Sequence, residues 1–242
     1  PAQAVHPMMQ VDVRILDRTW ILARVFADRL EHIAIEDLRA TSLSHQVPVK
    51  GPSDSRRERA LEEVDRRLTE AVAAGRTGAH IAEASIEAAD LARAIERPRD
   101  EVVGRFRRAE ELASKYGTPR LQVEASYQLA WTLYWWYEDY PAFVQQYEKV
   151  ESLAKDSRNV YDLEQLTNLW FCLVGKSTQE TLKAAEKSFL SLTSTLTTAL
   201  ERLRDEPDRP STSLQAEVHL AHVALTNAMR EGKPMDAHMV AI

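Results

Sequence analysis

Residues Glu83-Ala84-Ser85 recur 41 residues later as Glu124-Ala125-Ser126. At the same spacing and without a gap, the match continues through Ala89 and Ala130, Val103 and Val144, Phe106 and the aromatic Tyr147, Glu110 and Glu151, Leu112 and Leu153, and Ala113 and Ala154. Each copy holds two helical patterns, so the repeated unit is a two-helix hairpin. Such a hairpin cannot bury its apolar faces alone and must stack on its neighbours. The sequence therefore predicts an all-α protein, an α-solenoid of antiparallel helical hairpins.

Turn-forming residues divide the chain from residue 54 onward into eight predicted helices. Asp54 is expected to cap the first helix and Gly75 to end it, while Gly117, Thr118 and Pro119 mark the end of one helix and the start of another. The predicted helices cover residues 54–74, 78–95, 100–115, 119–138, 141–155, 160–174, 178–205 and 213–230. Because the connections are short, neighbouring helices are expected to run antiparallel.

The first part of the chain has a different pattern. Residues 11–15 alternate apolar and polar side chains, as in a half-buried strand, and Asp17 is placed to cap the helix that follows. We predict three regions: a strand-helix segment at 1–41 that forms the end of a preceding domain, a linker at 42–54, and the helical repeat domain at 55–242. The alternative for the first region is an arm that caps the first hairpin, since a lone strand leaves its edges unpaired.

The composition is that of a helical protein with a sizeable core. The 242-residue chain is 44% hydrophobic and 28% charged, which excludes disordered and collagen-like chains. Its seven glycines are few for turn-rich β architectures or phosphate-binding loops. The single cysteine, Cys172, cannot form an internal disulfide, and no apolar run is long enough for a membrane span or a signal peptide. We therefore expect a cytoplasmic protein without a membrane partner, and the start at Pro1 indicates a piece of a longer one.

The repeated units resemble tetratricopeptide repeats. The segment Val123-Glu-Ala-Ser-Tyr-Gln-Leu-Ala130, followed by Leu133, Asp139-Tyr140 and Phe143, is similar to the family pattern of small residues, turn and apolar positions. The resemblance covers residues 82–155, and a third unit at 160–195 fits more loosely. The 41-residue period exceeds the usual 34, so the resemblance is to a divergent relative, or to another helical-hairpin solenoid.

Nine of the 17 aromatic residues lie between positions 127 and 147. One interpretation is a central helix packed by neighbours on both sides, because aromatic residues at helical spacing are usually core. The other is a groove for a peptide, since exposed Trp and Tyr side chains are good binding anchors. The family resemblance implies that the first helix of each hairpin lines such a groove, and it assigns ligand binding to Glu124, Tyr127, Trp131, Tyr134, Asp90, Arg93 and Asn168.

Other candidate sites are weaker. His219 and His222 share a helix face, but nothing identifies further ligands, so we expect no metal and no cofactor. Arginines at 56–67 and 105–108 alternate with carboxylates, the pattern of a solvated helix face, so nucleic acid is not an expected partner. Cys172 has no local arrangement of His or Asn in the sequence that would suggest a catalytic nucleophile, and the sequence shows no other set of catalytic residues.

The sequence thus predicts a non-enzymatic helical-repeat scaffold that binds a protein or peptide partner, or another domain of its own chain. It would be the interaction or regulatory region of a larger intracellular bacterial protein. The alternative is the sensor or scaffold arm of a multidomain nuclease-type enzyme whose catalytic residues lie outside this chain, because the segment at 11–22 resembles the exit from nuclease-like domains in bacterial defence proteins. Self-association through exposed hairpin faces is a third interpretation.

Overall fold

The structure, a computed structural model, describes residues 52–176 and 186–231. These ranges hold eight helices and no strand, which confirms the predicted all-α domain. The helices are α6 (Pro52–Ala73), α7 (Ala79–Ala94), α8 (Arg99–Tyr116), α9 (Pro119–Trp135), α10 (Tyr140–Ala154), α11 (Val160–Lys176), α12 (Glu186–Arg204) and α13 (Pro210–Arg230). The predicted strand at 11–15 and the start of the helix predicted at 178 lie outside the described residues.

Several predicted helix ends are confirmed, and others need correction. The Thr118 side chain accepts a hydrogen bond from the Leu121 amide at 3.3 Å, with Pro119 in the first turn of α9. Gly75 has a φ of 62°, the left-handed conformation expected after α6. Gly117, in contrast, ends α8 in an extended conformation.

The starts of two helices were predicted too late. Helix α6 begins at Pro52, so Asp54 lies inside it and does not precede it, and α13 begins at Pro210 instead of residue 213. Proline fits the first turn of a helix because its fixed φ is helical and its missing N–H is not needed there. The prolines therefore mark these starts better than the polar residues that follow them.

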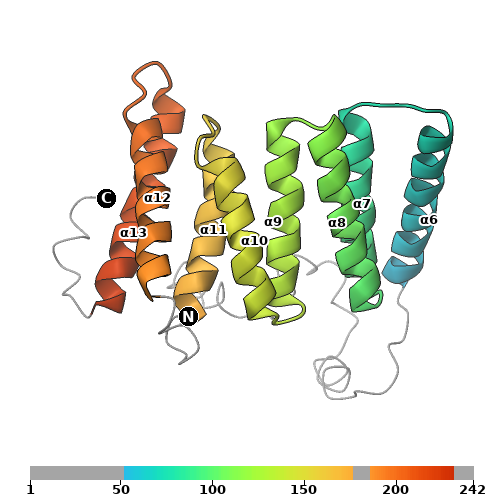
Figure 1. The fold of residues 1–242 in the computed structure, drawn as a ribbon, viewed down its shortest axis with the longest axis horizontal. Helices are drawn as coiled ribbons and strands as arrows, with labels where there is room; N and C mark the ends of the chain where they lie inside the picture. Colours follow the sequence, from blue (N-terminus) through green and yellow to red (C-terminus); the bar gives the residue numbers. More distant parts are fainter. Residues whose placement is uncertain (1–51, 177–185, 232–242) are drawn as a thin grey trace, which may run out of the picture. The chain divides into compact units, whose positions relative to one another are not determined.

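The helices are packed in chain order, as successive hairpins. Each helix from α6 to α12 packs against the next one, and α7, α9, α11 and α13 also contact one another in that order. These four helices form a first layer, and α6, α8, α10 and α12 form a second. Figure 1 shows the helices following one another across the view, with α6 and α13 at opposite ends, so they do not close into a bundle.

Equivalent positions of successive repeat units are buried alike. Phe106 in α8 and Tyr147 in α10 are both 0% exposed, as are Ala113 and Ala154 in the last turns of these helices. A third copy also fits: small hydroxyl side chains are buried at the equivalent place in three first-layer helices, at Ser85, Ser126 and Thr167. The 41-residue repeat therefore corresponds to one hairpin per unit.

The core runs between the two layers. Its largest fully buried side chains include Trp170 in α11 and Leu200 in α12, besides the aromatic pair of the repeat. A smaller apolar cluster around Ile81 and Leu112 joins α6 and α7 to α8 and α9.

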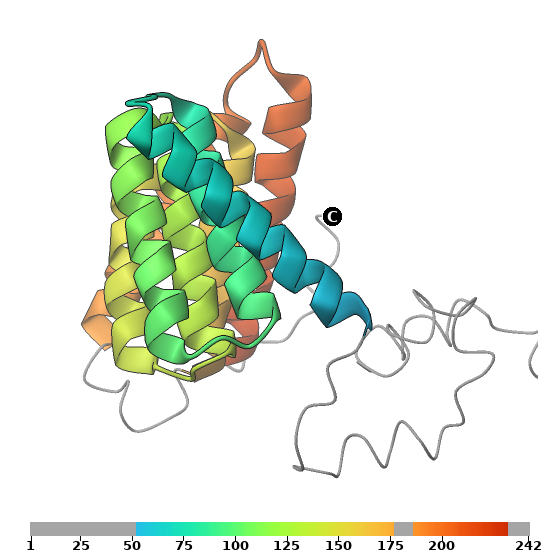
Figure 2. The ribbon, with the colours of Figure 1, turned by 90° about the vertical axis from the view of Figure 1, so that its right-hand side faces the viewer.

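Helix α6 is inclined to the helices behind it in Figure 2. None of the helices in the described ranges is both long and apolar enough for a membrane span.

Candidate functional site

A groove lies on the first layer between α7 and α9. Its volume is about 520 Å³. Apolar side chains of both helices, Ile86, Leu91, Ala94 and Leu121, form part of its lining. Four carboxylates and one guanidinium complete it, from Glu83, Glu87, Asp90, Glu124 and Arg93. We call this cavity the α7–α9 groove.

Arg93 links the two helices of the groove. Its guanidinium donates hydrogen bonds to Asp90 Oδ1 at 2.8 Å, to Thr132 Oγ1 at 2.8 Å and to Gln128 Oε1 at 3.3 Å. Its Cζ atom also lies 4.6 Å from the centroid of the Trp136 ring, a cation–π distance. The side chain is only 14% exposed. Burial lowers the pKa of Arg93, although the charge of Asp90 opposes that shift. The arginine is thus fixed in place and already paired.

Glu124 links α9 to α11, and its hydrogen-bond donors carry no charge. Its Oε1 atom accepts from Gln128 Nε2 at 2.9 Å, and its Oε2 atom accepts from Gln165 Nε2. Burial raises the pKa of the Asp90 carboxyl; Arg93 opposes this rise and the negative charge of Glu124 adds to it. The Asp90 and Glu124 carboxylates therefore repel each other across the groove.

An aromatic row follows the other side of α9. The ring centroids of Tyr127 and Trp131 lie 5.8 Å apart, and those of Trp131 and Trp135 lie 5.6 Å apart. The Tyr127 hydroxyl is hydrogen-bonded to Asn168 in α11, and burial raises the pKa of Tyr127 to about 12 although this bond opposes the shift. Trp135 is 56% exposed. The aromatic row, Tyr127, Trp131 and Trp135, thus runs from a half-buried tyrosine to an exposed tryptophan.

Tyr134 lies elsewhere. Its ring centroid is 5.0 Å from that of Phe143 and 5.7 Å from that of Tyr140, both in α10. Because Phe143 is fully buried, Tyr134 packs between the two layers. It supports the helix that carries the aromatic row and does not line the α7–α9 groove.

The seven predicted site residues thus fall into three places. Asp90, Arg93 and Glu124 line the α7–α9 groove. Tyr127, Trp131 and Asn168 lie on α9 and α11 at the aromatic row, and Tyr134 contacts α10. The aromatic segment is core in part, at Phe143 and Tyr147, whereas Trp135 and Trp136 are exposed; the peptide groove stays a prediction.

Sequence reasoning missed four residues of this site: Gln128, Thr132, Gln165 and Trp135. Two of them had a usable signal. Gln165 lies 41 residues after Glu124, which itself lies 41 residues after Glu83, so the repeat places these three side chains at one position of successive units. Gln128 is four residues from Glu124, the spacing at which helical side chains meet.

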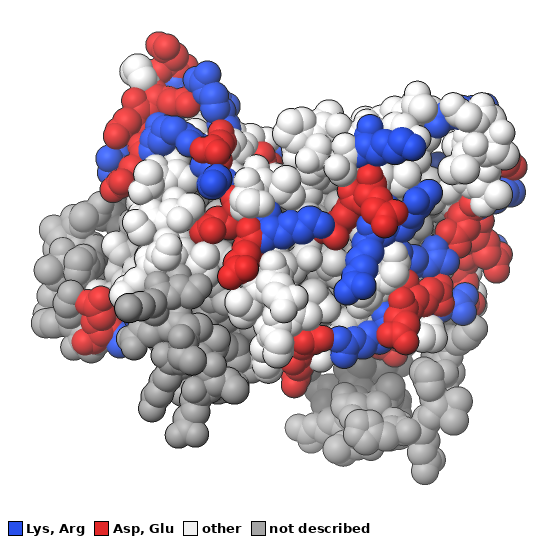
Figure 3. Space-filling view, viewed as in Figure 1, with Lys and Arg blue, Asp and Glu red and all other residues white. Residues whose placement is uncertain are grey.

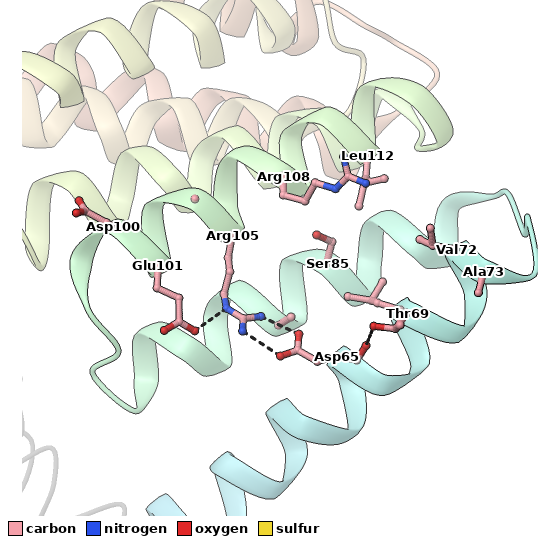
Figure 4. A pocket seen from close by; sticks show the side chains of 13 residues that line it. Asp65, Thr69, Val72, Ala73, Ser85, Asp100, Glu101, Arg105, Arg108 and Leu112 are labelled. Atoms are coloured by element: carbon pink, nitrogen blue, oxygen red, sulfur yellow. Dashed lines mark hydrogen bonds and ion pairs between the residues drawn. The ribbon is translucent and has the colours of Figure 1, made fainter.

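A second, larger groove separates α6 from α8. Its volume is about 890 Å³, and Leu68, Val72 and Leu112 give it an apolar end. Figure 4 shows Arg105 between the carboxylates of Asp65 and Glu101. Arg105 donates to the two Asp65 oxygens at 2.7 and 2.9 Å and to Glu101 at 3.0 Å. Arg105 thus neutralises two carboxylates of this groove, from Asp65 and Glu101.

The other sequence candidates show ordinary surface or core environments. Acidic and basic side chains alternate over the α6 and α8 end of the row in Figure 3, where Arg66 pairs with Glu63 at 2.7 Å. Burial raises the pKa of Cys172 to about 12, although a hydrogen bond to Trp135 opposes the shift. Burial also lowers the pKa of His219. Within the described ranges no three His, Cys, Asp or Glu side chains are arranged to hold a metal ion.

Comparisons of the chain with protein-family models, with curated proteins and with solved structures find no match.

Proposed function

We propose that this chain is a divergent tetratricopeptide-like solenoid whose first-layer face binds a peptide segment of another protein or of a neighbouring domain. One observation carries the proposal: α9 carries both one wall of the α7–α9 groove and an aromatic row that ends in the exposed Trp135, and hydrogen bonds to α7 and α11 hold this helix in place. Recognition sites combine large apolar anchors with fixed polar groups. Such a surface can bind its ligand without any catalytic residue.

The positions of the polar side chains support binding without rearrangement. Arg93 is fixed by three hydrogen-bond acceptors, and Glu124 by amides from two helices. A surface that is ordered before the ligand arrives loses less entropy on binding. The exposed ring of Trp135 then offers a large apolar area with few rotatable bonds.

The test uses the full 242-residue chain as bait for a library of random peptides, followed by calorimetric titration of the enriched peptides. The double variant Trp131→Ala/Trp135→Ala is expected to weaken binding about tenfold or more. The control is Leu190→Ala, which removes a 55% exposed apolar side chain from the second layer and leaves binding unchanged. Both variants are checked for helix content by circular dichroism. Failure to enrich any peptide, or equal binding by both variants, contradicts the proposal.

A further inference from the structure

The α7–α9 groove carries more negative charge than its own basic side chains neutralise. The groove is lined by four carboxylates and one guanidinium, which leaves three net negative charges. Glu83 is exposed and has no partner among the described residues, and Glu87 approaches Arg67 only at 3.8 Å. Glu124 is bonded to amides. Only Asp90 has a close cation, in Arg93.

Three carboxylates of the second layer or its turns are each paired with a cation. Asp65 is paired with Arg105 at 2.7 Å, Glu110 with Lys149 at 2.8 Å, and Asp139 with Arg99. Each of these pairs joins two neighbouring helices of the layer or a helix to an adjacent turn. These pairs contrast with the α7–α9 groove, in which Asp90 alone of the four lining carboxylates has a close cation.

Charge and shape together select one kind of ligand. A groove with low-dielectric walls and carboxylates of one sign attracts cations and concentrates them. Its apolar lining, Ile86 and Leu121 among it, suits the aliphatic stems that arginine and lysine side chains carry. The exposed ring of Trp135 lies at the end of the same helix, where a guanidinium or ammonium can rest on a ring face.

We infer that the α7–α9 groove binds a cationic peptide segment, one in which arginine or lysine alternates with apolar residues. The inference rests on the proposed function and names the chemistry of its partner. An extended segment of about eight residues spans the roughly 24 Å length of α7. Its basic side chains meet Glu83, Glu87 and Glu124, and its apolar side chains lie against the groove lining.

The experiment extends the peptide selection described above. Peptides enriched on the full chain are sequenced and their net charge is counted, and one is titrated against Glu83→Gln/Glu124→Gln. Enriched peptides are expected to be positively charged. The double variant is expected to weaken binding about tenfold, and raising the salt from about 0.05 to 0.5 M is expected to weaken it as well. The matched control, Glu62→Gln/Glu111→Gln, neutralises two exposed carboxylates on α6 and α8 and leaves the affinity unchanged.

The outcomes separate this inference from the proposed function. Neutral or acidic peptides that still require Trp131 and Trp135 would overturn the cationic ligand and leave the peptide-binding surface intact. No enriched peptide at all would remove both. If Glu83→Gln/Glu124→Gln fails to fold, the single variant Glu83→Gln, at an exposed position, replaces it, with about a threefold loss expected; unchanged binding would overturn the inference.

Discussion

Tyr147 and Phe106 occupy the same position in successive units, yet only Tyr147 carries a hydroxyl. Both side chains are 0% exposed. The Tyr147 hydroxyl has no hydrogen-bond partner among the described residues, and neither has Oε1 of Glu151. Burial, together with the nearby Glu151 charge, raises the pKa of Tyr147 well above its usual value. A buried hydroxyl without a partner costs about 1–3 kcal/mol relative to an apolar group of the same shape.

Replacing Tyr147 with the residue of the preceding unit should therefore stabilise the protein. Tyr147→Phe is expected to raise the free energy of unfolding by about 1 kcal/mol, measured by urea denaturation with circular dichroism. The control Tyr161→Phe changes a tyrosine that is 53% exposed and should leave stability unchanged. A loss of stability in Tyr147→Phe would show that the hydroxyl has a partner after all.

At the scale of the helix, two glycines of α8 have opposite roles. Gly104 lies in the middle of the helix, is exposed, and a methyl group there would meet nothing within 4 Å. Gly117 follows the last turn, and a methyl group there would lie 2.6 Å from the Ala113 carbonyl oxygen. That oxygen accepts the hydrogen bond from the Gly117 amide that closes the helix. Glycine is thus replaceable at one position and required at the other.

The two alanine variants should move stability in opposite directions. Gly104→Ala is expected to raise the free energy of unfolding by about 0.5–1 kcal/mol, because glycine inside a helix has excess freedom in the unfolded chain. Gly117→Ala is expected to lower it by about 1 kcal/mol or more, because backbone atoms must shift. Thermal denaturation followed at the helical circular dichroism band measures both. Equal effects would contradict the described end of α8.

Local sequence signals account for most helix ends. Thr118, Pro119 and Gly75 act through their own backbone or side chain, so their effect is readable without the rest of the fold. The hydrogen bonds of Arg93 in the α7–α9 groove were harder to predict, because its acceptors Thr132 and Gln128 lie 39 and 35 residues away in the sequence. Those contacts exist only after two first-layer helices are placed side by side. The repeat was therefore sufficient to predict the hairpins, whereas the residue pairs between hairpins could be identified only from the structure.

At the scale of the whole described domain, packing is between near neighbours in the chain. Helix α6 packs mainly on α7, and α13 on α12 and α11. The stability of such a row is approximately the sum of the stabilities of its units and of the contacts between neighbouring units. A destabilising mutation should therefore loosen mainly the helices next to it. Leu61 in α6 and Leu200 in α12 are both buried, at 3% and 0% exposure, near opposite ends of the row.

Two core variants test this locality. Leu61→Ala and Leu200→Ala should each cost about 2–4 kcal/mol through the cavity they leave. Native-state hydrogen exchange is expected to show faster exchange in α6 and α7 for the first variant and in α11 to α13 for the second. Uniform acceleration over all eight described helices in both variants would mean that the domain unfolds as one unit.

The crowding of tryptophan on one helix gives the protein a built-in optical reporter. Of the five tryptophans in the chain, Trp131, Trp135 and Trp136 lie at the C-terminal end of α9 or directly after it, and the rings of Trp131 and Trp135 are neighbours. Indole emission shifts to the blue when water leaves the ring and is quenched by nearby charged groups. Intrinsic fluorescence of the unlabelled chain should therefore respond when a ligand occupies the first-layer face.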